Sequence, residues 1–108
     1  MILIYSTYPD IATAKKAIHS LLERRLVACA NIIPGMQSIY RWQGKIEEAN
    51  EIIVIFKTQN QLFETCKSEI KKEHPYQVPC ILEIEIKQGD RDYLNWLKEE
   101  TDPSDAAL

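Results

Sequence analysis

Glu73 and His74 are the two neighbouring side chains of this sequence that could bind a metal ion together. They stand at the predicted end of a helix, just before Pro75, and carboxylate and imidazole are common ligands of divalent cations. Two donors from one chain make a weak site, which would be strengthened if several copies met or if Ser6 or Tyr5 approached. The alternative is that His74 only interacts with the dipole at a helix C-terminus. The residues alone favour this alternative.

Signatures of enzymes are missing from the sequence. It contains no GxSxG, HExxH or CxxC motif, and its three glycines are too few for a phosphate-binding loop. A Cys and His pair would need a thiol beside His74 or His19, and His19 falls on the polar face of the first predicted helix. We therefore expect no enzymatic activity and no obligatory cofactor.

The remaining reactive side chains are explained by structure rather than chemistry. Each cysteine sits within an apolar pattern and is predicted to be a reduced core thiol. The acidic clusters are typical of a solvated strand edge and a helix end. These residues are Cys29, Cys66 and Cys80, and Glu47, Glu48, Glu51, Glu99 and Glu100.

Hydrophobic periodicity predicts the elements that must position these residues. Residues 2–6 form a β-rich run, and residues 14–22 have apolar positions at helical spacing after Asp10, a predicted N-cap. Residues 62–72 form a second helix, capped by Thr58 or Asn60 and ended by Pro75. Residues 80–86 alternate as a strand with one apolar and one acidic face, and residues 93–97 form a short C-terminal helix.

Between the two predicted helices lies a long β-hairpin, residues 26–58, with its tip at Gln43 and Gly44. Fully extended, residues 26–42 would span roughly 56 Å, whereas a domain of this size has a radius of gyration near 13 Å. The hairpin must therefore bend, for which Pro34 and Gly35 are the candidates, or be covered by another subunit.

The order strand, helix, strand, strand, helix, strand predicts an α+β fold of the split βαβ, ferredoxin-like type, with an antiparallel sheet and an added C-terminal helix. We expect one domain over residues 1–100 and a loosely ordered tail over residues 101–108. Two helices cover one face of the sheet, yet both hairpin strands are apolar on both faces. A second copy is the expected cover, which predicts a homo-oligomer.

Composition limits the partners. The net charge of −3 disfavours nucleic acid, whose phosphates need a basic surface. No apolar run reaches membrane-spanning length, and the first residues do not resemble a signal peptide. We therefore expect a cytoplasmic protein that binds neither nucleic acid nor membrane.

Several segments closely resemble the CutA divalent-cation-tolerance proteins. The matching segments cover nearly the whole chain in the family order and spacing. They are ACANIIPG at 28–35, SIYRWQGKIEE at 38–48, FKT at 56–58, HPYQVP at 74–79 and DYLNWL at 92–97. The resemblance implies a ferredoxin-like subunit, similar to the PII signalling proteins, in a homotrimer held by the long strands. It also implies a cytoplasmic role in tolerance of copper and other divalent cations, without an established reaction.

The metal positions of the family match only in part. Copper binding there has been associated with a cysteine in the first strand and two adjacent histidines before the Pro-Tyr motif. Ser6 stands at the cysteine position and Glu73 at the first histidine, so that only His74 is retained. A hydroxyl is a poor ligand for soft copper. The resemblance thus implies a weak site for Cu(II) or another divalent cation at Glu73 and His74.

A second hypothesis is a PII-like signalling or scaffold trimer that binds a small ligand or a partner protein in clefts between subunits. For a small anionic ligand, the cations to consider are on the hairpin. They are Arg41, Lys45 and Lys57.

Overall fold

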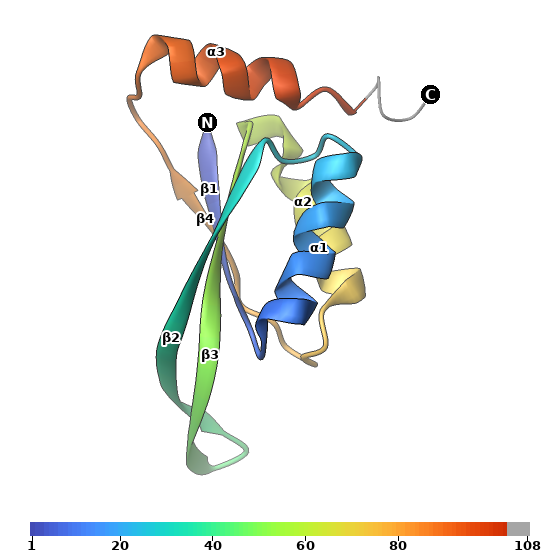
Figure 1. Cartoon of the computed structure of the whole chain (residues 1–108). Coiled ribbons are helices and arrows are strands. Elements are labelled where there is room, and N and C mark those ends of the chain that lie inside the picture. The colour runs from blue at the N-terminus through green and yellow to red at the C-terminus, as the bar shows by residue number, and fades with distance from the viewer. Residues whose placement is uncertain (104–108) are drawn as a thin grey trace.

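The computed structural model describes residues 1–103, which form a four-stranded sheet and three α-helices (Figure 1). In chain order the elements are β1 (Ile2–Tyr8), α1 (Ile11–Glu23), β2 (Cys29–Trp42), β3 (Lys45–Thr58), the 3-10 turn η1 (Asn60–Leu62), α2 (Phe63–Glu73), β4 (Ile81–Glu85) and α3 (Arg91–Glu100). This order confirms the predicted split βαβ arrangement with an added C-terminal helix.

The sheet has the strand order β2-β3-β1-β4, and every neighbouring pair is antiparallel. Helices α1 and α2 lie on the same face of the sheet, while α3 crosses its end near the N-terminus (Figure 1). Within residues 1–103, no other helix covers the opposite face. We call it the open face.

The core lies between the sheet and the two helices. Alternate residues of β1, β3 and β2 point toward the helices because successive side chains of a strand face opposite sides. They meet the apolar stripes of α1 and α2. The buried contributors include Ile2, Ile4, Tyr8, Val54, Phe56, Ala14, Ala17, Leu21, Cys66 and Ile70, with Ala30 and Ile32 packed against them.

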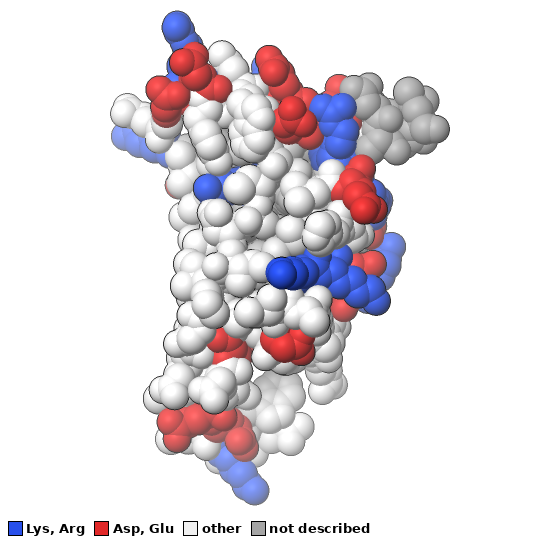
Figure 2. Space-filling model, viewed as in Figure 1, with Lys and Arg blue, Asp and Glu red and all other residues white. Residues whose placement is uncertain are grey.

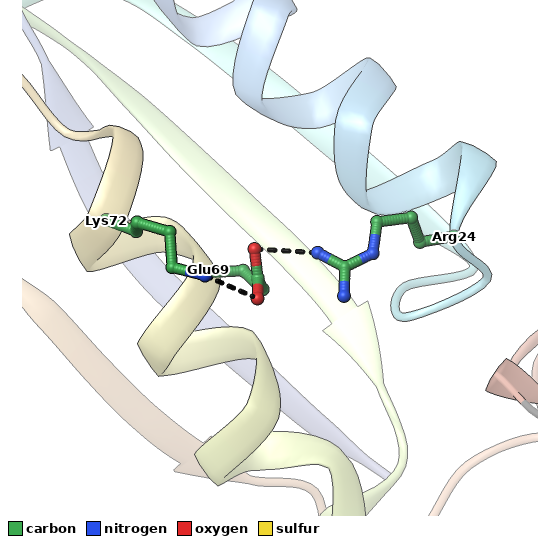
Figure 3. Close-up of polar contacts among 3 residues, drawn as sticks. All are labelled: Arg24, Glu69 and Lys72. Carbon is green, nitrogen blue, oxygen red and sulfur yellow. Dashed lines mark hydrogen bonds and ion pairs between the residues drawn. The ribbon is translucent and has the colours of Figure 1, made fainter. Parts of the chain in front are cut away.

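Local caps and ion pairs define the helices. The Asp10 side chain accepts a hydrogen bond from the backbone N–H of Thr13 at 2.7 Å, which confirms the predicted N-cap of α1. At the other end of α1, Arg24 forms an ion pair with Glu69 of α2, with 2.6 Å between the guanidinium nitrogen and the carboxylate oxygen. The same carboxylate forms a second ion pair with Lys72 at 3.4 Å (Figure 3). This exposed bridge aligns the two helices but adds little stability, because water screens it.

The predicted cap of α2 is wrong. The helix is entered from η1 through Leu62, and no side chain of the described residues caps it. Asn60 instead accepts a hydrogen bond from the terminal amino group at 2.7 Å, and Thr58 donates to the carbonyl oxygen of Leu26 at 2.6 Å. Both polar side chains are thus engaged by distant parts of the chain.

The hairpin turns at the predicted residues. Gln43 and Gly44 have φ of 49° and 81°, the two positive values that a type I′ turn requires. The predicted bend at Pro34 and Gly35 is a β-bulge, where the pairing register shifts between Ile33 and Met36. The long hairpin extends the molecule to 44 Å, with a radius of gyration of 14.6 Å, above the value near 13 Å expected for its length.

The bulge changes which residues of β2 reach the open face. Before it, Ile33 pairs with Ile53, which also pairs with Thr7; after it, Met36 pairs with Glu51 and Tyr40 with Glu47. Directly paired residues share a face. The open face therefore displays odd-numbered residues of β2 up to Ile33 and even-numbered residues from Met36 onward.

The open face is apolar at the edge strand β4. Leu82 and Ile84 lie opposite Tyr5 and Leu3 and are 56% and 45% exposed. The predicted alternation of this strand is confirmed, but its apolar side points away from the helices. In Figure 2 charged side chains gather at the two ends of the visible surface and over the helices, and the middle is mainly uncharged.

The three cysteines are free, as predicted, but they differ in burial. Cys66 is buried, and its thiol donates to the carbonyl oxygen of Leu26 at 3.3 Å. Burial raises the pKa of the Cys66 thiol to about 12. Cys29 and Cys80 are only partly buried within one chain, so that the prediction of core thiols is wrong for these two.

The chain remains ordered beyond α3. Thr101 is buried, and its carbonyl oxygen and hydroxyl accept hydrogen bonds from the side-chain amide of Gln59 at 2.9 and 2.7 Å. Contacts with the domain therefore extend past residue 100. Of the predicted tail over residues 101–108, residues 104–108 lie outside the described residues. None of the helices between residues 1 and 103 is both long and apolar enough to span a membrane.

Candidate functional site

His74 forms the C-cap of α2 and lies at the centre of an aromatic cluster. Pro75 disfavours helical geometry in the residue before it, and His74 is accordingly extended, with φ of −73° and ψ of 135°. This turns the imidazole inward, where its ring centroid lies 4.4 Å from that of Tyr8 and 4.8 Å from that of Tyr76. The side chain is buried rather than displayed at the helix end.

Both ring nitrogens of His74 are occupied. Nε2 lies 2.8 Å from the carbonyl oxygen of Thr7, which can only accept, so Nε2 carries the proton. Nδ1 lies 3.1 Å from the backbone nitrogen of Tyr76, which can only donate, so Nδ1 supplies its lone pair. Burial lowers the pKa of His74, although the Thr7 carbonyl and the Glu51 carboxylate oppose this. The imidazole is therefore neutral, with no lone pair left for a cation.

The structure does not gather the other candidate ligands around His74. Glu73 is exposed at the end of α2, and its side chain forms no hydrogen bond or ion pair with the residues between 1 and 103. Ser6 is completely buried on the helix side of β1. Among the described residues, no group of three or more His, Cys, Asp or Glu side chains could hold a metal ion.

Tyr8 lies between Ser6 and His74. Its ring packs against the imidazole, and burial raises the pKa of its hydroxyl to about 12, an effect that the nearby Ser6 hydroxyl reduces. Neither hydroxyl forms a hydrogen bond of normal geometry with any residue of the described chain. These two buried hydroxyls form a polar position inside an otherwise apolar core.

Tyr76 connects the His74 cluster to the hairpin. Its hydroxyl donates to Oε2 of Glu51 on β3 at 2.7 Å. Burial and the acceptor carboxylate raise the pKa of Tyr76 well above its usual range. The hairpin and the segment after α2 are thus joined within a single chain.

A groove of about 650 Å³ opens on the open face beside this contact. Its walls come from β1, the part of β2 after the bulge, β3, and the segment between α2 and β4. Four of the lining side chains are aromatic, and one, that of Glu51, is a carboxylate. The lining residues are Tyr5, Thr7, Ser38, Tyr40, Trp42, Ala49, Glu51, Pro75, Tyr76, Gln77, Val78 and Cys80.

The hairpin cations do not converge on this groove. Arg41 and Lys45 lie at the far end of the hairpin, next to its turn. Lys57 lies at the opposite end of β3, where its Nζ is 3.4 Å from the Tyr93 hydroxyl. None of the three lines the groove. The structure therefore offers no anion site built from these side chains.

Sequence reasoning missed Glu51 and Tyr76 as site residues. Glu51 is only 8% exposed, whereas its neighbours Glu47 and Glu48 are exposed, so it does not belong to a solvated acidic edge. One signal could have found it: Glu51 directly precedes the apolar run 52–56, where the strand enters the body of the sheet. Its partner Tyr76, distant in sequence, carries no such signal.

Comparison with known proteins gives consistent matches over the whole domain. The family model described as CutA1 divalent ion tolerance protein matches residues 2–100. The divalent-cation tolerance protein CutA of Pyrococcus horikoshii is 46% identical over 101 residues, which are 94% of this chain and 98% of that protein.

Solved structures agree with this match. The divalent cation tolerance protein Cut A1 of Thermus thermophilus is 42% identical, with a TM-score of 0.90, over 94% of this chain and 100% of that chain. The periplasmic divalent cation tolerance protein CutA of Archaeoglobus fulgidus is 39% identical, with a TM-score of 0.91, over the same shares.

Proposed function

Because the chain belongs to the CutA1 divalent ion tolerance family, we propose that it is a cytoplasmic homotrimer that acts in the tolerance of divalent cations. The names of its relatives carry no enzymatic activity, and we propose no reaction. The role is tested by the growth of cells that lack this gene in rising concentrations of Cu(II) or Zn(II). We expect these cells to grow less than wild type and the returned gene to restore growth. Growth of the cells without the gene equal to that of wild type at every concentration would contradict the role.

The apolar open face is the observation that supports the proposed homotrimer. Leu82 and Ile84 stay more than two-fifths exposed in a single chain, while Glu83 and Glu85 of the same strand take the other side. A strand that turns its apolar side away from its own helices needs a cover, and a closed symmetric assembly supplies one without loose strand edges. Three copies are what the family resemblance implies.

Light scattering after gel filtration tests this state. We expect the mass of three chains for wild type, and a lower mass for Leu82→Asp together with Ile84→Asp, because buried unpaired carboxylates would oppose association. Glu83→Gln, which lies between them on the opposite side, is the matched control and should remain a trimer. A wild-type monomer would overturn the proposal.

We further propose a weak site for Cu(II) or another divalent cation at Glu73 and His74. For the imidazole to bind, a cation must displace the Tyr76 N–H from Nδ1 or the Thr7 carbonyl from Nε2. Calorimetric titration of Cu(II) into wild type, His74→Ala and Glu73→Gln tests this site, with the exposed His19→Asn as control. Equal binding by all four proteins would exclude the site.

The groove supports a second candidate, a PII-like trimer that binds a small ligand or a protein at subunit clefts. Its volume of about 650 Å³ is within the range of small-molecule sites. Thermal-shift screening of metabolites tests this candidate. A stabilising compound whose effect is lost in a groove variant such as Tyr40→Ala is the expected result, and the absence of any stabilising compound would count against it.

A further inference from the structure

The C-terminal end of α3 is capped by side chains that come from other elements. The last four carbonyl groups of an α-helix have no partner within the helix. In α3 they belong to Leu97, Lys98, Glu99 and Glu100. Arg25, directly after α1, donates from Nε to the carbonyl oxygen of Glu100 at 3.2 Å and from Nη2 to that of Glu99. A guanidinium at this end also interacts favourably with the helix dipole.

Gln59, directly after β3, completes this cap. Its side-chain nitrogen donates to the carbonyl oxygen and the hydroxyl of Thr101 and lies 3.4 Å from the carbonyl oxygen of Lys98. The Thr101 hydroxyl in turn donates to the carbonyl oxygen of Leu97 at 2.8 Å. Gln61 donates to Oε1 of Gln59 at 2.7 Å, which fixes the orientation of the Gln59 amide. All four terminal carbonyl groups thus have partners outside the helix.

Arg25 reaches α3 from a strained backbone conformation. Its φ is 56°, in the left-handed region that residues with a Cβ adopt at a cost. The N–H of Arg25 donates to the carbonyl oxygen of Leu22, and the N–H of Leu26 to that of Leu21, both at 3.0 Å. This is the Schellman pattern, in which the left-handed position is usually glycine. Glycine would end α1 without strain, whereas the arginine side chain adds two hydrogen bonds at the end of α3.

The main hydrophobic core does not hold this end of α3. Within residues 1–103, the core cluster between the sheet and helices α1 and α2 contains no side chain of α3. Leu97 is the buried side chain of this helix, and it lies outside that cluster. A segment with few buried apolar contacts opens at a lower free energy than the core. The polar contacts of Arg25 and Gln59 therefore decide how firmly the end of α3 is held.

We propose that Arg25 and Gln59 form a latch for the C-terminal segment, residues 98–103. The segment opens and closes as a unit while the sheet and helices α1 and α2 stay folded. Arg25 is the positioning residue of this latch, and the strain at the end of α1 is offset by the contacts at the end of α3. Arg25 directly follows α1, which covers the helix side of the sheet (Figure 1), so the latch does not require an uncovered open face.

Amide hydrogen exchange of the full-length protein, followed by mass spectrometry with and without low urea, tests the latch. In wild type we expect the amides of residues 98–102 to exchange faster than those of β1 and β3. Their exchange should depend little on urea, because a local opening exposes little surface. If this segment exchanges only together with β1 and β3, at the same rate and with the same urea dependence, it opens by global unfolding and the proposal is overturned.

Arg25→Gly separates the two effects of the arginine. We expect exchange in residues 98–102 to rise by about tenfold, because two charge-assisted hydrogen bonds are lost. Exchange in β1 and β3 should stay unchanged or become slower, because glycine adopts the left-handed conformation without strain. Arg24→Ala is the matched control. The Arg24 side chain pairs with Glu69 of α2, so its loss should leave exchange in residues 98–102 as in wild type.

Gln59→Leu removes the other half of the latch. It should also raise exchange in residues 98–102, and it keeps the proposal testable if Arg25→Gly does not fold. Wild-type exchange of this segment in both latch variants would overturn the proposal. An equal rise in exchange over the whole chain would do so too, because it would show that these side chains stabilise the domain rather than the segment.

Discussion

At the scale of single residues, His74 shows how a side chain of metal-binding type can also hold parts of the fold together. Its two nitrogens join the end of β1 to the segment after α2, through Thr7 and Tyr76. Protonation would place a second N–H against the Tyr76 N–H and remove the acceptor. The same geometry that fixes the segment therefore makes its stability depend on pH.

We expect the free energy of unfolding of wild type to fall below pH 6.5, the ordinary pKa of histidine. The folded-state pKa of His74 is lowered, so the unfolded chain binds the proton more readily, and stability present above pH 6.5 is lost as the pH falls toward the folded-state pKa. The slope for one proton is at most about 1.4 kcal/mol per pH unit. Urea unfolding between pH 5 and 8, at fixed protein concentration, measures it.

Two variants isolate this effect from the titration of carboxylates. His74→Gln should lose the His74 contribution to the slope, and His19→Gln, at an exposed position of α1, should keep the wild-type profile. Parallel profiles for wild type and His74→Gln would show that His74 does not titrate on unfolding.

Thr58→Val tests the buried hydrogen bond that replaced a predicted helix cap. The variant removes the donor to the Leu26 carbonyl at a completely buried position. The carbonyl keeps the Cys66 thiol as a partner, so we expect a loss of about 1 kcal/mol in the free energy of unfolding. Thr65→Val, at an exposed position of α2, is the matched control. An unchanged urea midpoint for Thr58→Val would argue against the bond.

The cap of α1 and the cap of α2 show what residue patterns can predict. Asp10 needs only the backbone three residues later, so its role could be inferred from the sequence. Asn60 and Thr58 are bound by the amino terminus and by Leu26, which the sequence places 59 and 32 positions away. Contacts of this kind depend on the assembled fold, as does the hydrogen bond between Glu51 and Tyr76.

At the scale of elements, the hairpin of β2 and β3 depends on its two-residue turn. Both turn residues have positive φ, a region that glycine adopts without strain and asparagine tolerates better than other residues. The sequence could predict the tip because Gln43 and Gly44 connect two segments, residues 26–42 and 46–56, that are rich in Ile, Val, Tyr and Trp. It could also locate the bend, although not that the bend would be a bulge.

Gly44→Ala should destabilise the protein by about 1 kcal/mol, because alanine pays a steric cost at a φ of 81°. Gln43→Asn should raise stability slightly for the converse reason. Thermal unfolding by circular dichroism measures both. Lys45→Ala, beside the turn, is the control, and a Gly44→Ala protein as stable as this control would contradict the turn assignment.

The faces of β4 could be predicted only in part. The alternation of apolar and acidic side chains can be predicted from residues 80–86. Periodicity does not say which of the two sides meets the helices. Pairing with β1 settles this, because Leu82 lies opposite Tyr5 on the open face. An apolar side directed outward is a property of a chain that does not complete its own core.

At the scale of the whole molecule, the proposed assembly predicts that stability depends on protein concentration. Unfolding of a trimer releases three chains, so dilution favours the unfolded state. We expect the Tm of wild type to rise when concentration is raised about a hundredfold, and the Tm of Leu82→Asp with Ile84→Asp to stay constant. Differential scanning calorimetry measures both, and a wild-type Tm that ignores concentration would speak for a folded monomer.

The bulge at Pro34 and Gly35 shifts the alternation of side chains in the outer part of β2, residues 36–42. Because β2 gains one residue relative to β3 there, the residues after the bulge alternate in the opposite phase to the residues before it. An unbroken alternation from Ile33 would place Ile39 on the open face and turn Tyr40 and Trp42 the opposite way. One extra residue therefore decides the chemical character of the outer hairpin, with no substitution in it.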